Sequence, residues 1–76
     1  MEMIEIDGVM YNRRHGGPFD RGTADSYYGR PSNPHYFTGA TYDSVMLEEV
    51  DMSEKEIADY LAGYAYNEYH GNKKEY

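Results

Sequence analysis

Cysteine and tryptophan are both absent from this chain of 76 residues. The lack of cysteine excludes disulfides, thiol catalysis and cysteine-based zinc sites, and it suits a reducing cytosol. No apolar run approaches the roughly 20 residues of a membrane span, and the first residues lack the basic start of a secretion signal. We therefore expect one small, soluble, intracellular domain without membrane contact. A chain this short buries only about 60% of its unfolded surface, so we expect a thin core.

Positive charge is scarce, because 7 Lys and Arg face 14 Asp and Glu, for a net charge of −7. Such a charge repels phosphate backbones and attracts basic surfaces, so direct nucleic-acid binding is disfavoured. The arginines, all in the first half, are Arg13, Arg14, Arg21 and Arg30. We expect them to form internal ion pairs with Asp20, Asp25 and the acidic second half. The alternative is a patch for an anionic partner.

Tyrosine is abundant, with ten residues. Its ring is large and apolar, but its hydroxyl needs water or a hydrogen-bond partner. Such a composition is typical of a half-wet core, a contact surface, or both. The tyrosines that we assign to the core are Tyr27, Tyr28, Tyr60 and Tyr64. Those that remain for a partner or a dimer are Tyr36, Tyr42, Tyr66, Tyr69 and Tyr76.

Residues 1–12 predict a β-hairpin. Two runs rich in β-branched and aromatic residues, near 3–6 and 9–12, flank Asp7-Gly8, a dipeptide that supplies the positive φ angles of a tight turn. An isolated hairpin is barely stable in water, so we expect this one to pack on a helix.

A short helix is predicted over residues 20–29. Asp20 can cap its start, and Gly29 is a natural stop. Ala24, Tyr27 and Tyr28 have the spacing of one helical face.

A longer helix is predicted over residues 53–70. Residues 53–56 form a capping box, in which a serine hydroxyl and a glutamate three positions later bond each other's backbone amides. Gly63 lies in the middle of this helix, at a cost of about 1 kcal/mol relative to alanine. A close approach of the first helix, at Gly22 or Ala24, would explain that glycine.

The segment 30–52 lacks clear periodicity, except that 44–50 could form a short strand or turn. Irregular connections of this length are often functional. The sequence therefore predicts an α+β domain over 1–76, in which an N-terminal β-hairpin packs on two helices joined by a long loop.

Candidate catalytic and metal-binding residues lack the spacing that their chemistry requires. His15, His35 and His70 have no second ligand at zinc spacing. The acids lack the loop pattern of a calcium site, and no serine lies in a nucleophile elbow. We expect no enzymatic activity, no metal and no cofactor. A polar network shared by His15 and His35 is an alternative use of those residues.

Two segments carry a resemblance to a known group of proteins. They are RHGGPFDRGTADSYYGRPSNPHY (14–36) and MSEKEIADYLAGY (52–64). Together they resemble a group of small, largely uncharacterised tailed-bacteriophage proteins. The resemblance implies a phage-encoded protein but brings no activity with it.

A weaker similarity is to ribosome modulation factor, carried by the segments 21–24, 29–36 and 60–64. That resemblance implies two helices packed through their glycines. It does not readily transfer ribosome binding, because ribosome modulation factors are basic and this chain is acidic.

We predict a phage accessory protein in the cytoplasm of the host bacterium that binds a host protein and modulates or inhibits it. The candidate contact residues are Tyr36, Tyr42, Asp43, Glu48, Glu49, Asp51, Tyr66 and Tyr69. The alternatives for the acids are mimicry of nucleic-acid phosphates or a solvated face without a partner. The alternatives for the protein are a ribosome- or RNA-associated modulator, a minor virion or assembly component, and a homo-oligomer.

Overall fold

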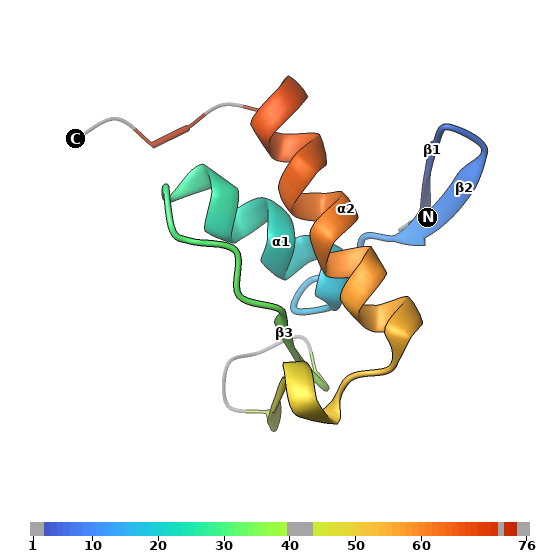
Figure 1. The fold of residues 1–76 in the computed structure, drawn as a ribbon, viewed down its shortest axis with the longest axis vertical. Helices are drawn as coiled ribbons and strands as arrows, with labels where there is room; N and C mark the ends of the chain where they lie inside the picture. Colours follow the sequence, from blue (N-terminus) through green and yellow to red (C-terminus); the bar gives the residue numbers. More distant parts are fainter. Residues whose placement is uncertain (1–2, 40–43, 72, 75–76) are drawn as a thin grey trace.

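The computed structural model describes residues 3–39, 44–71 and 73–74, in which a β-hairpin precedes two crossed helices (Figure 1). The predicted α+β class, with a hairpin followed by two helices joined by a loop, is confirmed. The elements are β1 (Met3–Ile6), β2 (Val9–Asn12), α1 (Pro18–Tyr27), β3 (His35–Phe37), β4 (Met46–Glu48), the 3-10 turn η1 (Glu49–Asp51) and α2 (Glu54–His70). Within the described residues, neither α1 nor α2 combines the length and apolar character that crossing a lipid bilayer requires.

The hairpin forms where the sequence predicts it. β1 and β2 pair antiparallel, with Ile6 opposite Val9 beside the turn. Asp7 and Gly8 both adopt positive φ, at 52° and 83°, as a tight two-residue turn requires.

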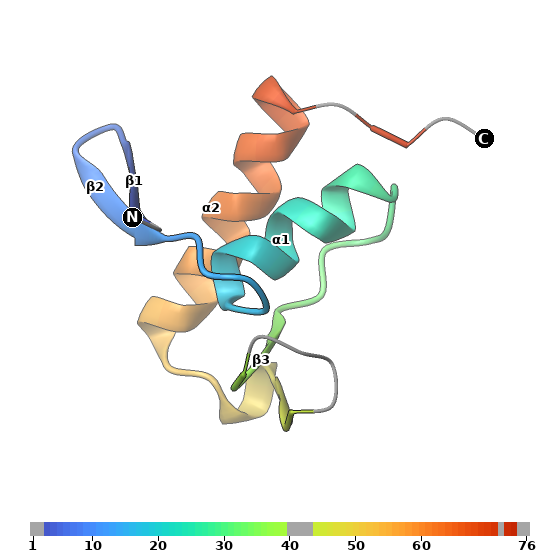
Figure 2. The same ribbon diagram turned by 180° about the vertical axis from the view of Figure 1, so that it is seen from behind.

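Tyr11 connects the hairpin to the helices. Its ring centre lies 5.5 Å from that of Phe19 at the start of α1. Lys55 of α2 places its ammonium group 4.9 Å from the centre of the same ring. One aromatic side chain therefore links the hairpin to both helices. The hairpin itself lies alongside α2 (Figures 1 and 2).

α1 begins earlier than predicted. Gly17 is its N-cap and Pro18 its first residue, so the predicted cap at Asp20 of a helix over 20–29 is wrong. The fixed φ of proline suits the first position of a helix, which explains the earlier start. Asp20 lies in the first turn instead, where its Oδ2 accepts a hydrogen bond from the N–H of Gly16 at 2.9 Å.

α1 ends beside Gly29, as predicted. Gly29 has a φ of 70°, in the left-handed region. Its N–H donates to the carbonyl of Ser26 at 3.0 Å, and the N–H of Arg30 donates to the carbonyl of Asp25 at 2.8 Å. These bonds satisfy carbonyls that the end of the helix would otherwise leave without partners.

α1 and α2 cross in backbone contact. A Cβ atom on Gly22 would overlap the carbonyl oxygen of Tyr60, and one on Gly63 would overlap the carbonyl of Phe19. The predicted close approach at Gly63 is therefore confirmed. Gly22 lies at the crossing as expected, with Tyr60 as its neighbour.

The core lies at this crossing. Tyr60 is fully buried and Tyr64 is half-buried, but Tyr27 and Tyr28 are 38% and 39% exposed, so their assignment to the core is wrong. The backbone contact at Gly22 turns a different face of α1 toward α2. The buried residues of α1 are Phe19, Arg21, Gly22, Asp25 and Ser26.

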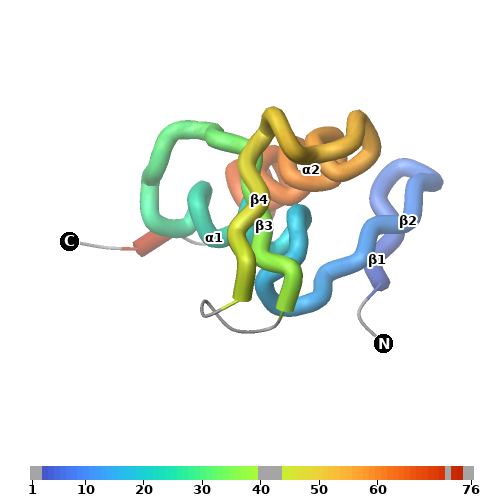
Figure 3. The backbone as a smooth tube through the Cα atoms, turned by 90° about the horizontal axis from the view of Figure 1, so that it is seen from below, coloured from blue at the N-terminus to red at the C-terminus, as the bar shows by residue number. Residues whose placement is uncertain are grey.

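The segment 30–52, predicted as a loop, contains a second pair of strands. β3 and β4 pair antiparallel, with Tyr36 opposite Leu47, and they lie side by side in Figure 3. The strand or turn predicted within 44–50 corresponds to β4 and the start of η1, whereas no sequence pattern indicates β3.

The capping box of α2 forms as predicted. The N–H of Glu56 donates to Oγ of Ser53 at 3.1 Å, and the N–H of Ser53 donates to Oε1 of Glu56 at 2.8 Å. Gly71 is the C-cap of α2.

Candidate functional site

Three of the predicted contact acids gather on what we call the β4–η1 surface, which comprises Met46, Glu48, Glu49, Val50 and Asp51. All five residues are exposed, and Val50 is 86% exposed. Met52, which follows directly, is buried and anchors the end of η1 in the fold. The surface therefore presents the side chain of Val50, flanked by carboxylates, on a turn that the buried Met52 holds in place.

Tyr36 lies next to this surface but is held in place. Its hydroxyl donates a hydrogen bond to the carboxylate of Glu56, which raises the pKa of Tyr36 and lowers the pKa of Glu56; partial burial adds to the first effect. The guanidinium of Arg14 lies 6.0 Å from the centre of the tyrosine ring. Tyr36 therefore connects β3 to the capped start of α2, with part of its surface exposed.

Of the remaining predicted contact residues, only Tyr66 and Tyr69 are placed by the structure. Tyr42 and Asp43 lie outside the described residues. Tyr66 and Tyr69 lie near the far end of α2, since a helix rises 1.5 Å per residue and Tyr66 is about 18 Å along the axis from Glu54. The structure thus divides the predicted contact surface into two regions.

Tyr66 and Tyr69 line a groove between α2 and the hairpin. The groove has a volume of about 520 Å³. Tyr69 is 87% exposed, whereas the ring of Tyr66 packs 5.9 Å from that of Phe19. The residues that line the groove are Ile6, Asp7, Tyr11, Ala62, Ala65, Tyr66, Tyr69 and His70.

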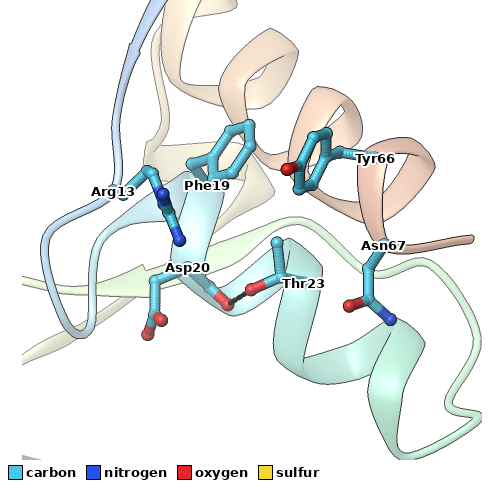
Figure 4. A pocket seen from close by; sticks show the side chains of 6 residues that line it. All are labelled: Arg13, Phe19, Asp20, Thr23, Tyr66 and Asn67. Carbon is cyan, nitrogen blue, oxygen red and sulfur yellow. Dashed lines mark hydrogen bonds between the residues drawn. The ribbon is translucent and has the colours of Figure 1, made fainter. Parts of the chain in front are cut away.

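A smaller pocket of about 220 Å³ is also lined by Tyr66 (Figure 4). Arg13 lies at one side of this pocket and Asn67 at the other, with Thr23 between them. The hydroxyl of Thr23 donates to the backbone carbonyl of Asp20 at 2.7 Å. This pocket is small and polar, and its hydroxyl is already used within α1.

The buried carboxylate of Asp25 is the centre of a polar cluster. Nη1 of Arg30 lies 3.3 Å from it and Nη2 of Arg21 lies 4.0 Å from it. The hydroxyl of Tyr60 donates to the same carboxylate, and Nδ1 of His35 lies 3.8 Å away. Burial raises the pKa of Tyr60, and the bond to Asp25 raises it further. Within the part of the chain that the structure describes, the predicted internal ion pairs form at Arg21 and Arg30.

The other two arginines have separate surroundings. Arg14 donates to the carbonyl of Phe37 at 2.9 Å, and Arg13 lines the pocket of Figure 4. His15 and His35 contact different acids. Nδ1 of His15 lies 3.9 Å from Asp20, whereas His35 lies beside the Asp25 cluster.

The exposure of Val50 and the burial of Asp25 are not among the sequence-based predictions, although each leaves a signal in the sequence. An apolar residue stands between two acids in Glu49-Val50-Asp51, on a segment that would otherwise be wholly polar. Asp25 follows Gly22 by three positions, and therefore shares the helical face that the glycine brings into contact. In α1, Gly22 is a better guide to the buried face than the aromatic pair Tyr27-Tyr28.

Among residues 3–39, 44–71 and 73–74, no group of three or more His, Asp or Glu side chains is arranged to hold a metal ion. No protein-family model, curated protein or solved structure matches the chain significantly. The chemistry of the chain's own surfaces is therefore the basis for assigning a role.

Proposed function

We propose that this protein is a non-catalytic binding protein that docks onto a basic surface of a partner protein through the β4–η1 surface. The observation that carries the proposal is the exposure of Glu48, Glu49 and Asp51 around Val50 on an anchored turn. Charges of one sign steer and orient a complementary partner, while a buried apolar contact contributes most of the affinity. The β4–η1 surface supplies both.

A neighbouring apolar residue extends this surface. Val45 is 65% exposed, and Met46, which follows it within the surface, is 48% exposed. Scattered apolar side chains on a surface are normal, but a cluster bordered by charge is typical of an interaction site. Val45, Met46 and Val50 are three exposed apolar residues within six positions of the chain, close in sequence to the three acids.

The buried polar groups support a binding role over a catalytic one. In the described part of the chain, no buried side-chain nitrogen or oxygen lacks a hydrogen-bond partner. Asp25, Tyr60 and His35 are committed to one another and to the arginines. Their chemistry is therefore used to hold α1, α2 and β3 together.

The resemblance to small tailed-phage proteins makes a host protein in the infected bacterium the proposed partner. A host protein whose own ligand is anionic, such as a nucleic-acid enzyme, has the basic surface that the acids would match. The proposed outcome is modulation or inhibition of that protein by occupation of its basic surface.

Affinity capture from infected cells, followed by binding measurements on the captured partner, tests this function. We expect the triple variant Glu48→Lys/Glu49→Lys/Asp51→Lys to lose partner binding while it stays folded. Glu49→Lys alone should weaken binding more than Glu5→Lys, which makes the same charge change at an exposed site on β1. Unchanged affinity in the triple variant would contradict the proposal.

One observation favours the alternative of an RNA-associated modulator. The guanidinium of Arg30 lies 4.8 Å from the centre of the exposed Tyr28 ring, and the ammonium of Lys74 lies 5.7 Å from the same ring. Exposed aromatic rings with cations beside them are typical of contacts to single-stranded nucleic acid. A salt titration of RNA binding separates the two functions, because the alternative requires affinity that rises steeply as the salt concentration falls.

A further inference from the structure

β3 and β4 differ in what occupies their outer edges. On the outer side of β3, the N–H of Phe37 donates to the carbonyl of Gly16 at 2.7 Å. On the same side, Arg14 donates to the carbonyl of Phe37 at 2.9 Å. The loop before α1 therefore covers this edge of the sheet.

The outer edge of β4 has no such cover among the described residues, in which the sheet consists of β3 and β4 alone. The N–H of Thr38 donates to the carbonyl of Val45 at 3.0 Å. Residues opposite each other in an antiparallel pair alternate between bonded and non-bonded positions. With Thr38 and Val45 bonded, Leu47 also bonds toward β3, whereas Met46 directs its N–H and carbonyl away from β3. The N–H of Glu48 points outward for the same reason.

We propose that the outer edge of β4 accepts an extended segment of the partner protein as a third strand, and that this segment is basic beside Glu48 and apolar beside Met46. This inference rests on the proposed function, since it specifies how the β4–η1 surface would hold its partner. Main-chain hydrogen bonds supply affinity in this mode of recognition, and alternate side chains supply specificity.

The side chains beside this edge indicate the chemistry of the added strand. Glu48, Glu49 and Asp51 put carboxylates at one end of β4, where lysine or arginine side chains of an added strand would meet them. Met46 and Val45 offer apolar contacts at the other end. Opposite charges across a strand pair are stabilising, and like charges are destabilising.

The same charges exclude a second copy of the chain as the occupant. Two β4 strands paired edge to edge would bring two sets of Glu48, Glu49 and Asp51 together, on molecules that each carry a net charge of −7. Short, charged edge strands protect proteins against self-pairing. The acidic edge of β4 therefore disfavours pairing with a second β4 strand and favours pairing with a basic strand.

The experiment uses the isotope-labelled full chain and a synthetic peptide of about eight residues, a common strand length, with valines in one half and lysines in the other. Amide chemical shifts and hydrogen exchange are measured by NMR with and without the peptide. We expect the amides of Met46 and Glu48 to shift and to exchange more slowly, while Leu47, already bonded to β3, changes little. The control is the same peptide methylated at every backbone nitrogen, which keeps its charge but whose methyl groups hold its backbone too far from β4 to pair; it should not protect these amides.

Met46→Pro tests the edge from the side of the protein. Proline is tolerated in edge strands where the N–H faces solvent, so this variant loses the outward donor and keeps the bonds to β3. We expect the affinity for the peptide to fall about fivefold, the equivalent of one backbone hydrogen bond. If Met46→Pro disturbs the fold, the comparison between the two peptides decides alone.

Several results would overturn the strand addition. They are shifts confined to the hairpin or to the groove of Tyr69, equal protection by the methylated peptide, and unchanged affinity in a folded Met46→Pro variant. Binding to the captured partner distinguishes a failure of strand addition from a failure of the proposed function. If Met46→Pro binds the captured partner normally while the charge-reversal variant does not, strand addition fails and the proposed function stands. If both variants bind normally, both fail.

Discussion

The α1–α2 crossing and the β4–η1 surface use their residues in opposite ways. At the crossing, two backbones touch at Gly22 and Gly63, and the buried polar cluster of Asp25 is satisfied internally. At the β4–η1 surface, apolar and acidic side chains face solvent beside a strand whose outer edge has no described neighbour. A small chain can thus concentrate its stability in one crossing, which leaves the connection between its helices available for a partner.

The largest effect on stability is expected from Gly63→Ala. Alanine normally stabilises a helix by about 1 kcal/mol relative to glycine, but here its Cβ would overlap the backbone of Phe19. We expect a loss of about 3 kcal/mol, which urea unfolding followed by circular dichroism measures. Ala58→Gly, at an exposed site of α2, is the control. It should lower the free energy of unfolding by only about 1 kcal/mol, the usual difference between alanine and glycine in a helix. A more stable Gly63→Ala protein would show that the helices do not touch.

Tyr60→Phe tests the polar half of the same crossing. The change keeps the ring but removes the hydroxyl that donates to Asp25 and accepts from the N–H of Asn33 at 3.1 Å. We expect a loss of about 2 kcal/mol in the free energy of unfolding, because the buried carboxylate of Asp25 and the N–H of Asn33 both lose a partner. Tyr27→Phe makes the same chemical change at an exposed site and should be nearly neutral. Equal losses in the two variants would contradict the cluster.

Glu56→Gln tests the link between the two regions. Folding lowers the pKa of Glu56, chiefly through the bond from Tyr36 and then through the bond from the Ser53 backbone. Its charge therefore stabilises the fold fully above its ordinary pKa of 4.5, and this stabilisation is lost as the pH falls through the lower pKa of the folded state. We expect Glu56→Gln to be less stable than the native chain by about 0.5 kcal/mol near neutral pH. The difference should shrink in urea titrations at about pH 3, and a constant difference would refute the assignment.

Val50→Ser should have the smallest effect on stability and a large one on binding. The side chain is 86% exposed, so we expect the free energy of unfolding to change by less than about 0.5 kcal/mol. Affinity for the captured partner should fall, because the apolar contact is lost. Val9→Ser, at an exposed position of β2, is the matched control. Binding that survives Val50→Ser but not charge reversal would mean that the acids act alone.

The parts of the fold that the sequence predicts correctly are those set by local chemistry. The positive φ angles of Asp7-Gly8 determine the hairpin turn, and the Ser53–Glu56 capping box determines the start of α2. The start of α1 was predicted too late because Asp20 has the side chain of a cap. Pro18 competes for the start, and its fixed φ prevails.

The remaining errors concern contacts between distant segments. The aromatic pair Tyr27-Tyr28 resembles a core stripe, but close contact at Gly22 selects the face beside it. β3 depends on a partner strand across the 38–45 connection and on the carbonyl of Gly16, neither of which leaves a local pattern. Exposure of the acids was predictable from their charge alone, whereas their separation from Tyr69 follows from the length of α2.

The hydrogen bond from Tyr60 to Asp25 makes Tyr60 an intrinsic spectroscopic probe of the α1–α2 crossing. A tyrosine side chain free in water ionises with a pKa of about 10. Tyr60 ionises later, because burial and the neighbouring carboxylate raise its pKa. Folding favours its neutral form, so the stabilisation it provides is intact below the ordinary pKa and is lost as the pH rises. Tryptophan is absent, so its absorbance does not obscure that of tyrosinate. An increase in tyrosinate absorbance at high pH, after the other tyrosines have ionised, would report the separation of α1 from α2 without any added label.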